Sequence, residues 1–295
     1  MMPEAVATTA VHDHKCILGE GSAYDAASDS AWWFDILGKT LFEHHFATGA
    51  TTLHELPFIA SQISFIDDER QLIWAESGLH VREIAGGRLT LHTAIEKTEK
   101  ITRSNDGRVH PCGALWMGTM GKEEEKGAGA IYWFFRGELK QLYRDVSIPN
   151  TICFSADGAT AYFSDTPTGL LMRVATDPAT GLPLGEPTIF NDSRKESGGP
   201  DGALVDAEGC LWNARWGGSR IDVYAPDGSL QRSIGLPVSQ PTCPLFIGAK
   251  ADRMLVTSAQ KGTPTDDLTT ESDAGRTLLL DLSVKGKHDP RVLID

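Results

Sequence analysis

A short phrase recurs six times along this chain, and the repetition restricts the fold more than any other feature of the sequence. Each copy has a turn built on Asp and Gly, then a short apolar or aromatic strand, then a turn built on Gly or Ser. An aromatic or apolar anchor marks each copy, at Trp32, Trp74, Trp116, Tyr162, Trp212 and Leu255. Self-similarity at a fixed period indicates a repeat architecture, in which each copy folds as one unit against its neighbours.

The anchors lie 42 to 50 residues apart, a period that suits one four-stranded blade of a β-propeller. Helical periodicity is nearly absent, whereas alternating and continuous apolar runs typical of strands are common. Further segments that we expect to form outer strands follow the anchors: TLFEHHF, GLHVREI, AIYWFF, LLMRVAT, RIDVYA and RTLLLDL. The sequence therefore predicts an all-β, six-bladed β-propeller with four antiparallel strands in each blade.

A ring of blades must also hide the free edge of its last sheet. The N-terminal strand around AVHDHKCIL can pair with C-terminal strands and so close the ring. Because no linker divides the chain, we expect residues 1–295 to form a single six-bladed propeller domain.

Charge and targeting signals limit the classes of partner. The chain has 27 Lys and Arg against 40 Asp and Glu, a formal net charge of −13, which repels the phosphates of nucleic acids and anionic membranes. The N-terminus has no signal-peptide pattern, and no apolar run is long enough to cross a membrane. We therefore expect a cytoplasmic monomer or homodimer with no nucleic-acid and no membrane partner.

The cysteines and two histidine motifs are interpreted as structural. The five cysteines are odd in number and never in C-x-x-C spacing, which argues against a disulfide framework and a thiolate zinc site. His110 and Cys112 are considered as a nucleophilic pair, but we expect their side chains to face apart. His12 and His14 of the HDH motif are expected to face solvent.

Oxygen-bearing side chains recur in phase with the anchors. Counting back 11 to 13 positions from each anchor reaches Glu20, Gln62, Asn105, Asn150, Asp201 and Thr242. Residues at a fixed offset occupy the same loop of successive blades, so these side chains should converge on one end of the central channel. Hard oxygen donors suit Ca²⁺, Mg²⁺ or Mn²⁺ better than a structural zinc. For Gln62 and Thr242 we favour a structural role, because polar residues in turns commonly bond their own backbone.

Five phrases of the chain resemble the family of senescence marker protein (regucalcin), gluconolactonase and related sugar lactonases. They are LGEGSAYDAASDSAWWFDI, RSNDGRVHPCGALWMGTM, IPNTICFSADGATAYFSDT, GGPDGALVDAEGCLWNARWGG and MLVTSAQ, in matching order and spacing. The resemblance implies a six-bladed propeller with one divalent metal ion (Ca²⁺, Zn²⁺, Mg²⁺ or Mn²⁺). It assigns the metal ligands to Glu20, Asn150 and Asp201.

The same resemblance assigns substrate contacts to Arg103, Asn105 and Glu123. Glu124 stays open as the alternative to Glu123, because KEEEK aligns either way. Two residues depart from the family pattern: Ser22 stands where Pro is usual, and Thr151 follows Asn150 where Gly is usual. We expect the backbone of these two ligand loops to differ locally from that of the family.

The activity that the resemblance implies is metal-dependent hydrolysis of a small sugar lactone, a reaction of carbohydrate metabolism. The ion would polarise the lactone carbonyl, and Asp201 would orient or deprotonate the attacking water. No G-x-S-x-G motif supports a serine nucleophile. Two alternatives stay open: a metal-dependent hydrolase of another ester or a phosphotriester, and a non-catalytic metal-binding propeller.

Overall fold

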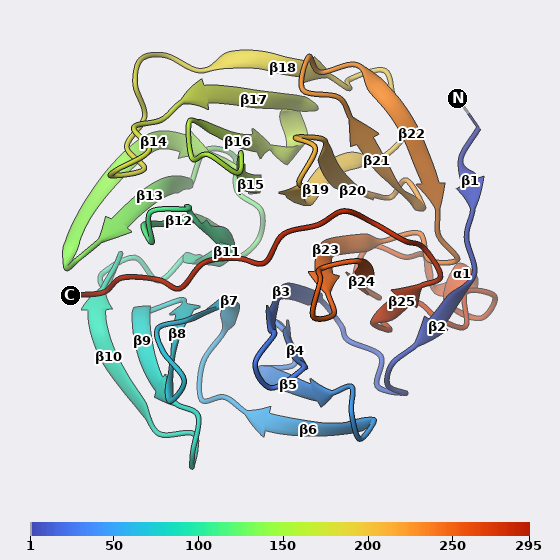
Figure 1. The fold of residues 1–295 in the computed structure, drawn as a ribbon, viewed down its shortest axis with the longest axis horizontal. Coiled ribbons are helices and arrows are strands. Elements are labelled where there is room, and N and C mark those ends of the chain that lie inside the picture. The colour runs from blue at the N-terminus through green and yellow to red at the C-terminus, as the bar shows by residue number, and fades with distance from the viewer. Residues whose placement is uncertain (1) are drawn as a thin grey trace.

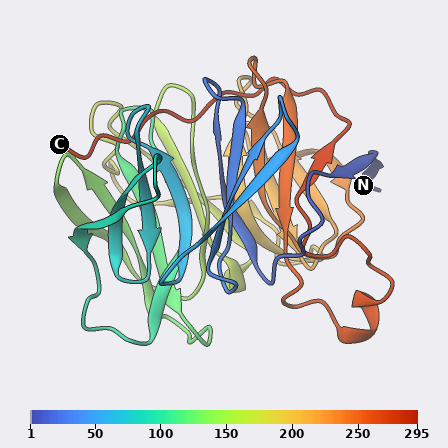
Figure 2. The ribbon, with the colours of Figure 1, turned by 90° about the horizontal axis from the view of Figure 1, so that it is seen from below.

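The computed structural model describes residues 2–295 and shows six β-sheets arranged around a central axis, as blades of a propeller (Figure 1; Figure 2 from the side). Blades 1 to 3 comprise β3 (Gly19–Asp25), β4 (Ser30–Asp35), β5 (Thr40–His45), β6 (Ala50–Glu55); β7 (Ala60–Phe65), β8 (Arg70–Ala75), β9 (Gly78–Glu83), β10 (Leu89–Ala94); β11 (Thr102–Val109), β12 (Leu115–Gly121), β13 (Gly129–Phe135) and β14 (Glu138–Val146). Blades 4 and 5 comprise β15 (Pro149–Phe154), β16 (Thr160–Asp165), β17 (Leu170–Ala175), β18 (Thr188–Asp192); β19 (Gly199–Val205), β20 (Leu211–Trp216), β21 (Arg220–Tyr224) and β22 (Leu230–Gly235). The predicted architecture is confirmed.

Blade 6 is built from both ends of the chain, as the closure argument predicts. It comprises β23 (Pro241–Ile247), β24 (Arg253–Ser258), β25 (Leu278–Leu280) and the N-terminal strand β2 (Thr8–Ala10). β2 pairs antiparallel with β25, and it lies slightly before the expected AVHDHKCIL segment. The N–H groups of Val11 and Cys16 continue the contact by donating to Thr277 O and Gly275 O. A further short strand, β1 (Glu4–Ala5), pairs parallel with β22 and is not predicted by the sequence.

The segments expected to be outer strands are the third strands of their blades (β5, β9, β13, β17, β21 and β25). The sequence does not predict the outermost strands, because they lack a continuous apolar pattern. β6, for example, has the sequence ATTLHE and is largely exposed. A strand at the edge of a sheet and facing solvent has little apolar surface to bury, so its sequence carries a weak signal.

The apolar core of the described residues divides into six clusters, one at each junction between neighbouring blades. The six predicted anchors are all buried, and each lies on the second strand of its blade. Two of the anchor indoles also bond to the next blade: Trp74 Nε1 donates to Gly118 O at 3.0 Å, and Trp116 Nε1 donates to Gly181 O at 2.9 Å. Packing around the whole ring therefore fixes the inner strands relative to one another.

Two aspartates at the ends of second strands hold the chain that enters the inner strand. Asp35 accepts the N–H groups of Ile17 and Leu18 at 3.0 and 3.1 Å. Asp165 accepts those of Ser147 and Ile148 at 3.1 and 2.8 Å in blade 4. These bonds set the chain just before Glu20 and Asn150.

Helical structure among residues 2–295 is confined to the 3₁₀ turn η1 (Thr166–Thr168) and α1 (Thr265–Leu268). Neither helix has the length and apolar character that a membrane span requires.

Candidate metal and lactone site

Each of the six inner strands carries a break in its pairing with the second strand. The breaks fall between Glu20 and Ala23, Ala60 and Gln62, Ser104 and Gly107, Asn150 and Cys153, Pro200 and Ala203, and Pro241 and Pro244. A β-bulge bends its strand and turns a side chain away from the regular alternation. The six residues that the sequence phase singles out all lie at these breaks.

Hydroxyl groups at the bulges join the inner strands of neighbouring blades. Ser61 Oγ donates to Asn105 O at 2.5 Å, Thr151 Oγ1 to Asp201 O at 2.9 Å, and Thr242 Oγ1 to Gly19 O at 2.6 Å. These bonds pass from blade 2 to 3, from 4 to 5, and from 6 to 1. Thr242 therefore has the structural role expected of it.

Blade 5 meets blade 6 through a glycine instead. A Cβ atom on Gly202 would lie 2.7 Å from Thr242 O and 3.0 Å from Cys243 Cα, so only glycine permits this approach. The approach places Asp201, the preceding residue, at the channel mouth. This contact accounts for the glycine that follows Asp201 in the PDG sequence.

One pocket on the channel axis collects side chains from five blades. It is lined by Leu18, Glu20, Arg103, Asn105, Met120, Glu124, Ile148, Asn150, Thr166, Asp201, Trp216 and Lys261. The three candidate metal ligands, Glu20, Asn150 and Asp201, thus face the same space although they are far apart in the sequence. Gln62 does not line this pocket, since its amide donates to Ile63 O and Ser64 Oγ on its own strand.

A hydroxyl fixes the orientation of the Asn150 amide. Thr166 Oγ1 donates its single proton to Pro200 O at 2.8 Å. It can therefore only accept from Asn150 Nδ2, also at 2.8 Å. The amide oxygen Oδ1 is left facing the site, where its neighbour is Asn105 Nδ2 at 3.3 Å.

Thr151 adopts the left-handed conformation, with φ +63°. This region favours glycine, the residue expected here from the family pattern, and is strained for a β-branched side chain. The hydroxyl offsets the strain, since it bonds Asp201 O and accepts from Asn213 Nδ2 at 3.2 Å. Because glycine would also adopt this conformation, the expected difference in backbone stays a prediction. What Thr151 adds at this position is the pair of hydroxyl contacts.

Arg103 and Asn105 form one hydrogen-bonded unit on the wall from blade 3. Arg103 Nη1 donates to Asn105 Oδ1 at 2.9 Å, and Asn105 Nδ2 donates to Pro149 O at 2.9 Å. Both side chains are nearly buried. Burial lowers the pKa of Arg103 to about 10, against the charges of Glu20, Glu124 and Asp201, so the guanidinium stays protonated at neutral pH.

The site contains an excess of buried acid. Burial raises the pKa of Glu20 to about 8, with repulsion from Asp106 adding to the shift. Burial also raises the pKa of Asp201 well above its usual range, and repulsion from Glu20 and Asp106 contributes. A divalent cation at this point would supply the positive charge that the carboxylates lack. Two carboxylates and an oriented amide oxygen are hard donors, so the residues present fit a divalent ion.

Of the two glutamates left open for the substrate contact, only Glu124 lines the pocket. Glu124, not Glu123, lies on the pocket wall, where its carboxylate accepts Lys261 Nζ at 2.6 Å. Glu124 comes from blade 3 and Lys261 from the loop after β24 in blade 6. Because these blades stand on opposite sides of the ring, the ion pair spans the mouth of the pocket.

Sequence reasoning missed several wall residues, including Met120, Ile148, Trp216 and Lys261. Met120 and Ile148 belong to phrases already matched to the family, so their position next to candidate ligands was an available signal. Trp216 is the last residue of β20 and lies beside Gly262, whose added Cβ would be 2.8 Å from the indole. Lys261 carried no signal, since a lone lysine after a strand is common.

A second group of possible metal ligands lies apart from this pocket. Atoms of His14, Cys16 and Asp35 are within 4.8 Å of one another. Asp35, however, already accepts backbone N–H groups with both oxygens, from Ile17, Leu18 and Gly38. Burial, together with the charge of Asp35, raises the pKa of the Cys16 thiol. We therefore assign this cluster a structural role. His14 is exposed, as expected.

The His110 and Cys112 side chains do not face apart, contrary to expectation. Cys112 Sγ lies 3.0 Å from His110 Nδ1, because residues 111–113 form a turn that brings the two together. His110 Nε2 donates to Gly158 O at 2.9 Å. Burial lowers the pKa of His110 and raises that of Cys112, which opposes formation of a thiolate. The pair is a packing feature.

A six-bladed propeller with clustered oxygen donors at one end of its axis defines the class of this protein. The sequence profile described as "SMP-30/Gluconolactonase/LRE-like region" matches residues 18–260. The chain belongs to the SMP-30/gluconolactonase/LRE-like family.

Individual relatives extend over nearly the whole chain. A Rhizobium meliloti (strain 1021) protein provisionally named a sugar lactone lactonase is 49% identical over 273 residues, 92% of each chain. The L-arabinolactonase of Azospirillum brasilense is 30% identical over 274 residues, 90% of this chain and 89% of its own. The crystal structure of a calcium-binding protein, regucalcin, from Agrobacterium tumefaciens strain C58 superposes with a TM-score of 0.96 at 47% identity, covering 97% of both chains.

We predict that Gly202→Ala destabilises the protein by about 1 to 3 kcal/mol, the usual cost of overpacking. The new methyl group would meet the carbonyl of Thr242, which cannot move without breaking the junction of blades 5 and 6. Urea unfolding measures the change. Gly235→Ala is the control, because its added Cβ would make only ordinary 3.4 Å contacts. Equal stability of the two variants would contradict the prediction.

Proposed function

We propose that this protein hydrolyses a small sugar lactone with the help of one divalent metal ion. Glu20, Asn150 and Asp201 would hold the ion, and Arg103, Asn105 and Glu124 would contact the sugar. The observation that carries the proposal is the meeting of these six side chains in one pocket. The names of the relatives, a sugar lactone lactonase and an L-arabinolactonase among them, support the choice of substrate.

When bound, the ion would polarise the lactone carbonyl and stabilise the negative charge that develops on its oxygen. The protein itself supplies orientation and proton transfer. Asp201 is the candidate base for the attacking water, because it lies in the pocket and its buried carboxylate has a raised affinity for protons. Arg103 remains a donor for ring oxygens or an anionic substituent, since only Nη1 is shared with Ser104 O and Asn105.

The walls of the pocket suit a small, partly polar ring. Leu18, Met120, Ile148 and Trp216 provide apolar surface, on which the C–H face of a sugar can pack. Arg103 and the Glu124–Lys261 pair provide charged groups for its hydroxyls.

We extend the proposal to a cytoplasmic location, a single propeller domain, and a monomer or homodimer. The five free cysteines are consistent with a reducing compartment.

Removing a ligand should abolish metal binding and turnover together. We expect Asn150→Ala and Asp201→Asn to weaken divalent-ion binding by more than about 100-fold, because even partners outside the ligand shell cost 10- to 100-fold. Calorimetric titration of chelator-treated protein with Ca²⁺, Mg²⁺, Mn²⁺ and Zn²⁺ measures the affinity, and a panel of aldonolactones measures hydrolysis. Asn191→Ala, which removes an amide from outer strand β18, is the control. Metal binding without turnover of any lactone would instead identify a non-catalytic metal-binding propeller.

The hydroxyl that orients Asn150 can be tested separately. Thr166→Val removes the acceptor of Asn150 Nδ2 and frees the amide to rotate, so we expect a metal affinity about 10- to 100-fold lower. Thr168→Val changes a hydroxyl of the same 3₁₀ turn that bonds Asp165 O instead. It should leave the affinity unchanged. An unchanged affinity in Thr166→Val would show that the amide is held by other contacts.

The choice between the two neighbouring glutamates predicts a difference in KM. We expect Glu124→Gln to raise KM for the lactone about 10-fold, the equivalent of one hydrogen bond to a charged group. Glu123→Gln should have no effect, because Glu123 is absent from the pocket wall. Steady-state kinetics at saturating metal measures both. A higher KM in Glu123→Gln with an unchanged KM in Glu124→Gln would instead identify Glu123 as the residue that contacts the substrate.

A further inference from the structure

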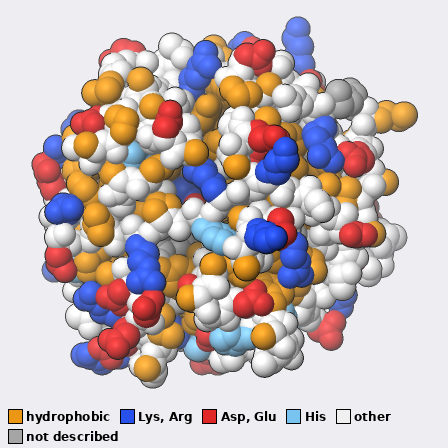
Figure 3. Space-filling view, in the orientation of Figure 1, with side chains coloured by type: hydrophobic (Ala, Val, Ile, Leu, Met, Phe, Trp, Pro, Cys, Tyr) orange, Lys and Arg blue, Asp and Glu red, His pale blue; other side chains and the backbone are white. Residues whose placement is uncertain are grey.

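Residues 286–295, here called the axial strap, cross the end of the ring opposite to the pocket (Figures 1 and 2). The pocket lies where the inner strands begin, at Glu20 and Asn150, whereas the strap lies against residues where inner strands end. It is tied to blades 6, 4, 2 and 3 by Gly286 N to Ala251 O, Lys287 Nζ to Phe154 O, His288 Nε2 to Gly248 O, Val292 N to Phe65 O and Leu293 N to Gly113 O. Side chains cover the centre of this face in the space-filling view (Figure 3).

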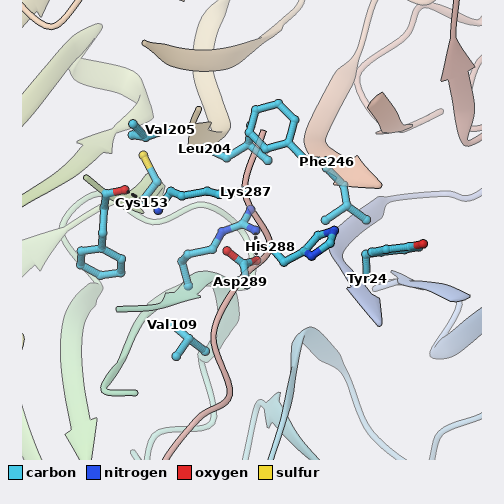
Figure 4. A pocket seen from close by; sticks show the side chains of 12 residues that line it. Tyr24, Val109, Cys153, Leu204, Val205, Phe246, Lys287, His288 and Asp289 are labelled. Atoms are coloured by element: carbon cyan, nitrogen blue, oxygen red, sulfur yellow. Dashed lines mark hydrogen bonds and ion pairs between the residues drawn. The ribbon is translucent and has the colours of Figure 1, made fainter. Parts of the chain in front are cut away.

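The strap places one acid over the channel axis. Asp289 Oδ2 accepts Arg108 Nη1 at 2.5 Å (Figure 4). The Arg108 side chain is only 7% exposed and rises from inner strand β11. Its second amino group, Nη2, donates to Ala203 O at 3.3 Å. A buried guanidinium depends on such partners, since removing one leaves an uncompensated charge.

Arg108 lies between the strap and the underside of the proposed metal site. Ala203, which it contacts, follows Asp201 by two residues in the bulge of β19. The cavity beside Arg108 reaches from Gly21, the residue after Glu20, to Asp289 and Pro290 of the strap. The strap therefore closes the channel on the far side of Arg108 from the proposed ligands.

A second acid on the axis links Arg108 to the third ligand. Asp106 is buried, and its two oxygens accept Gly107 N and Ile152 N, each at 2.8 Å. Ile152 lies in the bulge of β15 that begins at Asn150. Arg108 and Asp106 attract each other, and the charge of Asp106 acts on both Glu20 and Asp201. Asp289, Arg108 and Asp106 thus alternate in charge between the strap and the pocket, and Asp106 adds its negative charge to that of Glu20 and Asp201.

We propose that Asp289 of the axial strap is a positioning residue for the metal site, acting through Arg108 and Asp106. This inference rests on the proposed function. Asp289 holds the Arg108 head at the far end of the channel. Asp106 is then free to bond Ile152 N–H and keep the Asn150 loop in place. Without Asp289, the strongest remaining acidic partner of Arg108 on the axis is Asp106, and drawing Asp106 away from Ile152 would loosen that loop.

Loss of the Asp289 charge should weaken cation binding through two effects, both of which lower the affinity. The loop that carries Asn150 becomes less well fixed, and the buried positive charge of Arg108 is no longer neutralised. Both effects should lower the affinity for the metal ion. They should also lower kcat, because kcat depends on a correctly placed ion. They should leave KM for the lactone nearly unchanged, because Asp289 lies outside the pocket.

The test compares full-length Asp289→Asn with the parent by calorimetric titration with Mn²⁺ and with Ca²⁺, after chelator treatment. We expect a Kd about 10-fold higher, at the lower end of the cost of losing a residue that supports a metal ligand. Asp289→Glu, which keeps the charge, should recover part of the affinity. The matched control is Asp68→Asn, because Asp68 pairs with Arg291 of the same strap but is exposed at the rim. That control should keep the parent's affinity.

A Kd in Asp289→Asn equal to that of the parent would overturn the inference, as would an equal loss in Asp68→Asn. If Asp289→Asn fails to fold, the double variant Arg108→Met/Asp289→Leu removes the buried pair as a unit and avoids an unpaired charge. The folded double variant should still bind the ion more weakly, and parent-like affinity would overturn the inference. If the parent itself binds no divalent ion, or binds it as well in Asn150→Ala, the proposed function fails along with it.

Discussion

Close contact between the inner strands around the channel is the constraint on which the site depends. Hydroxyls of Ser61, Thr151 and Thr242 bond carbonyls of the next blade, and Gly202 lets blade 5 approach blade 6. These contacts fall at the bulges, so the features that hold the ring together also turn polar side chains toward its axis. The six apolar clusters behind them keep the inner strands from moving apart.

Much of this arrangement can be predicted from the sequence, because the ring repeats with a period that the sequence records. The anchors fix the number of blades, and a constant offset from them brings Glu20, Asn150 and Asp201 to equivalent places. The sequence identifies Gly202 as a turn residue. The structure shows that glycine is needed there because of a close contact with Thr242 on another blade. Position within a repeat is local information, and the sequence carries it well.

What could not be predicted depends on contacts between residues far apart in the chain. The orientation of the Asn150 amide follows from a proton on Thr166 that is donated to Pro200 O. The choice of Glu124 over Glu123 follows from the shape of one loop and from Lys261 across the mouth. The axial strap has no strand pattern at all, so nothing in residues 286–295 marks them as the cover of a channel.

The shared sixth blade has a consequence for how the molecule reaches its native state. β2 finds its partner only in β25, about 270 residues later in the chain, so the ring cannot be completed until both segments are present. Pairings of such large sequence separation are slow to form, because much chain entropy is lost before the contact is gained. During synthesis, the faces of blades 1 and 5 that pack against blade 6 stay uncovered until that blade forms, and strand exchange with another chain competes with closure in this period.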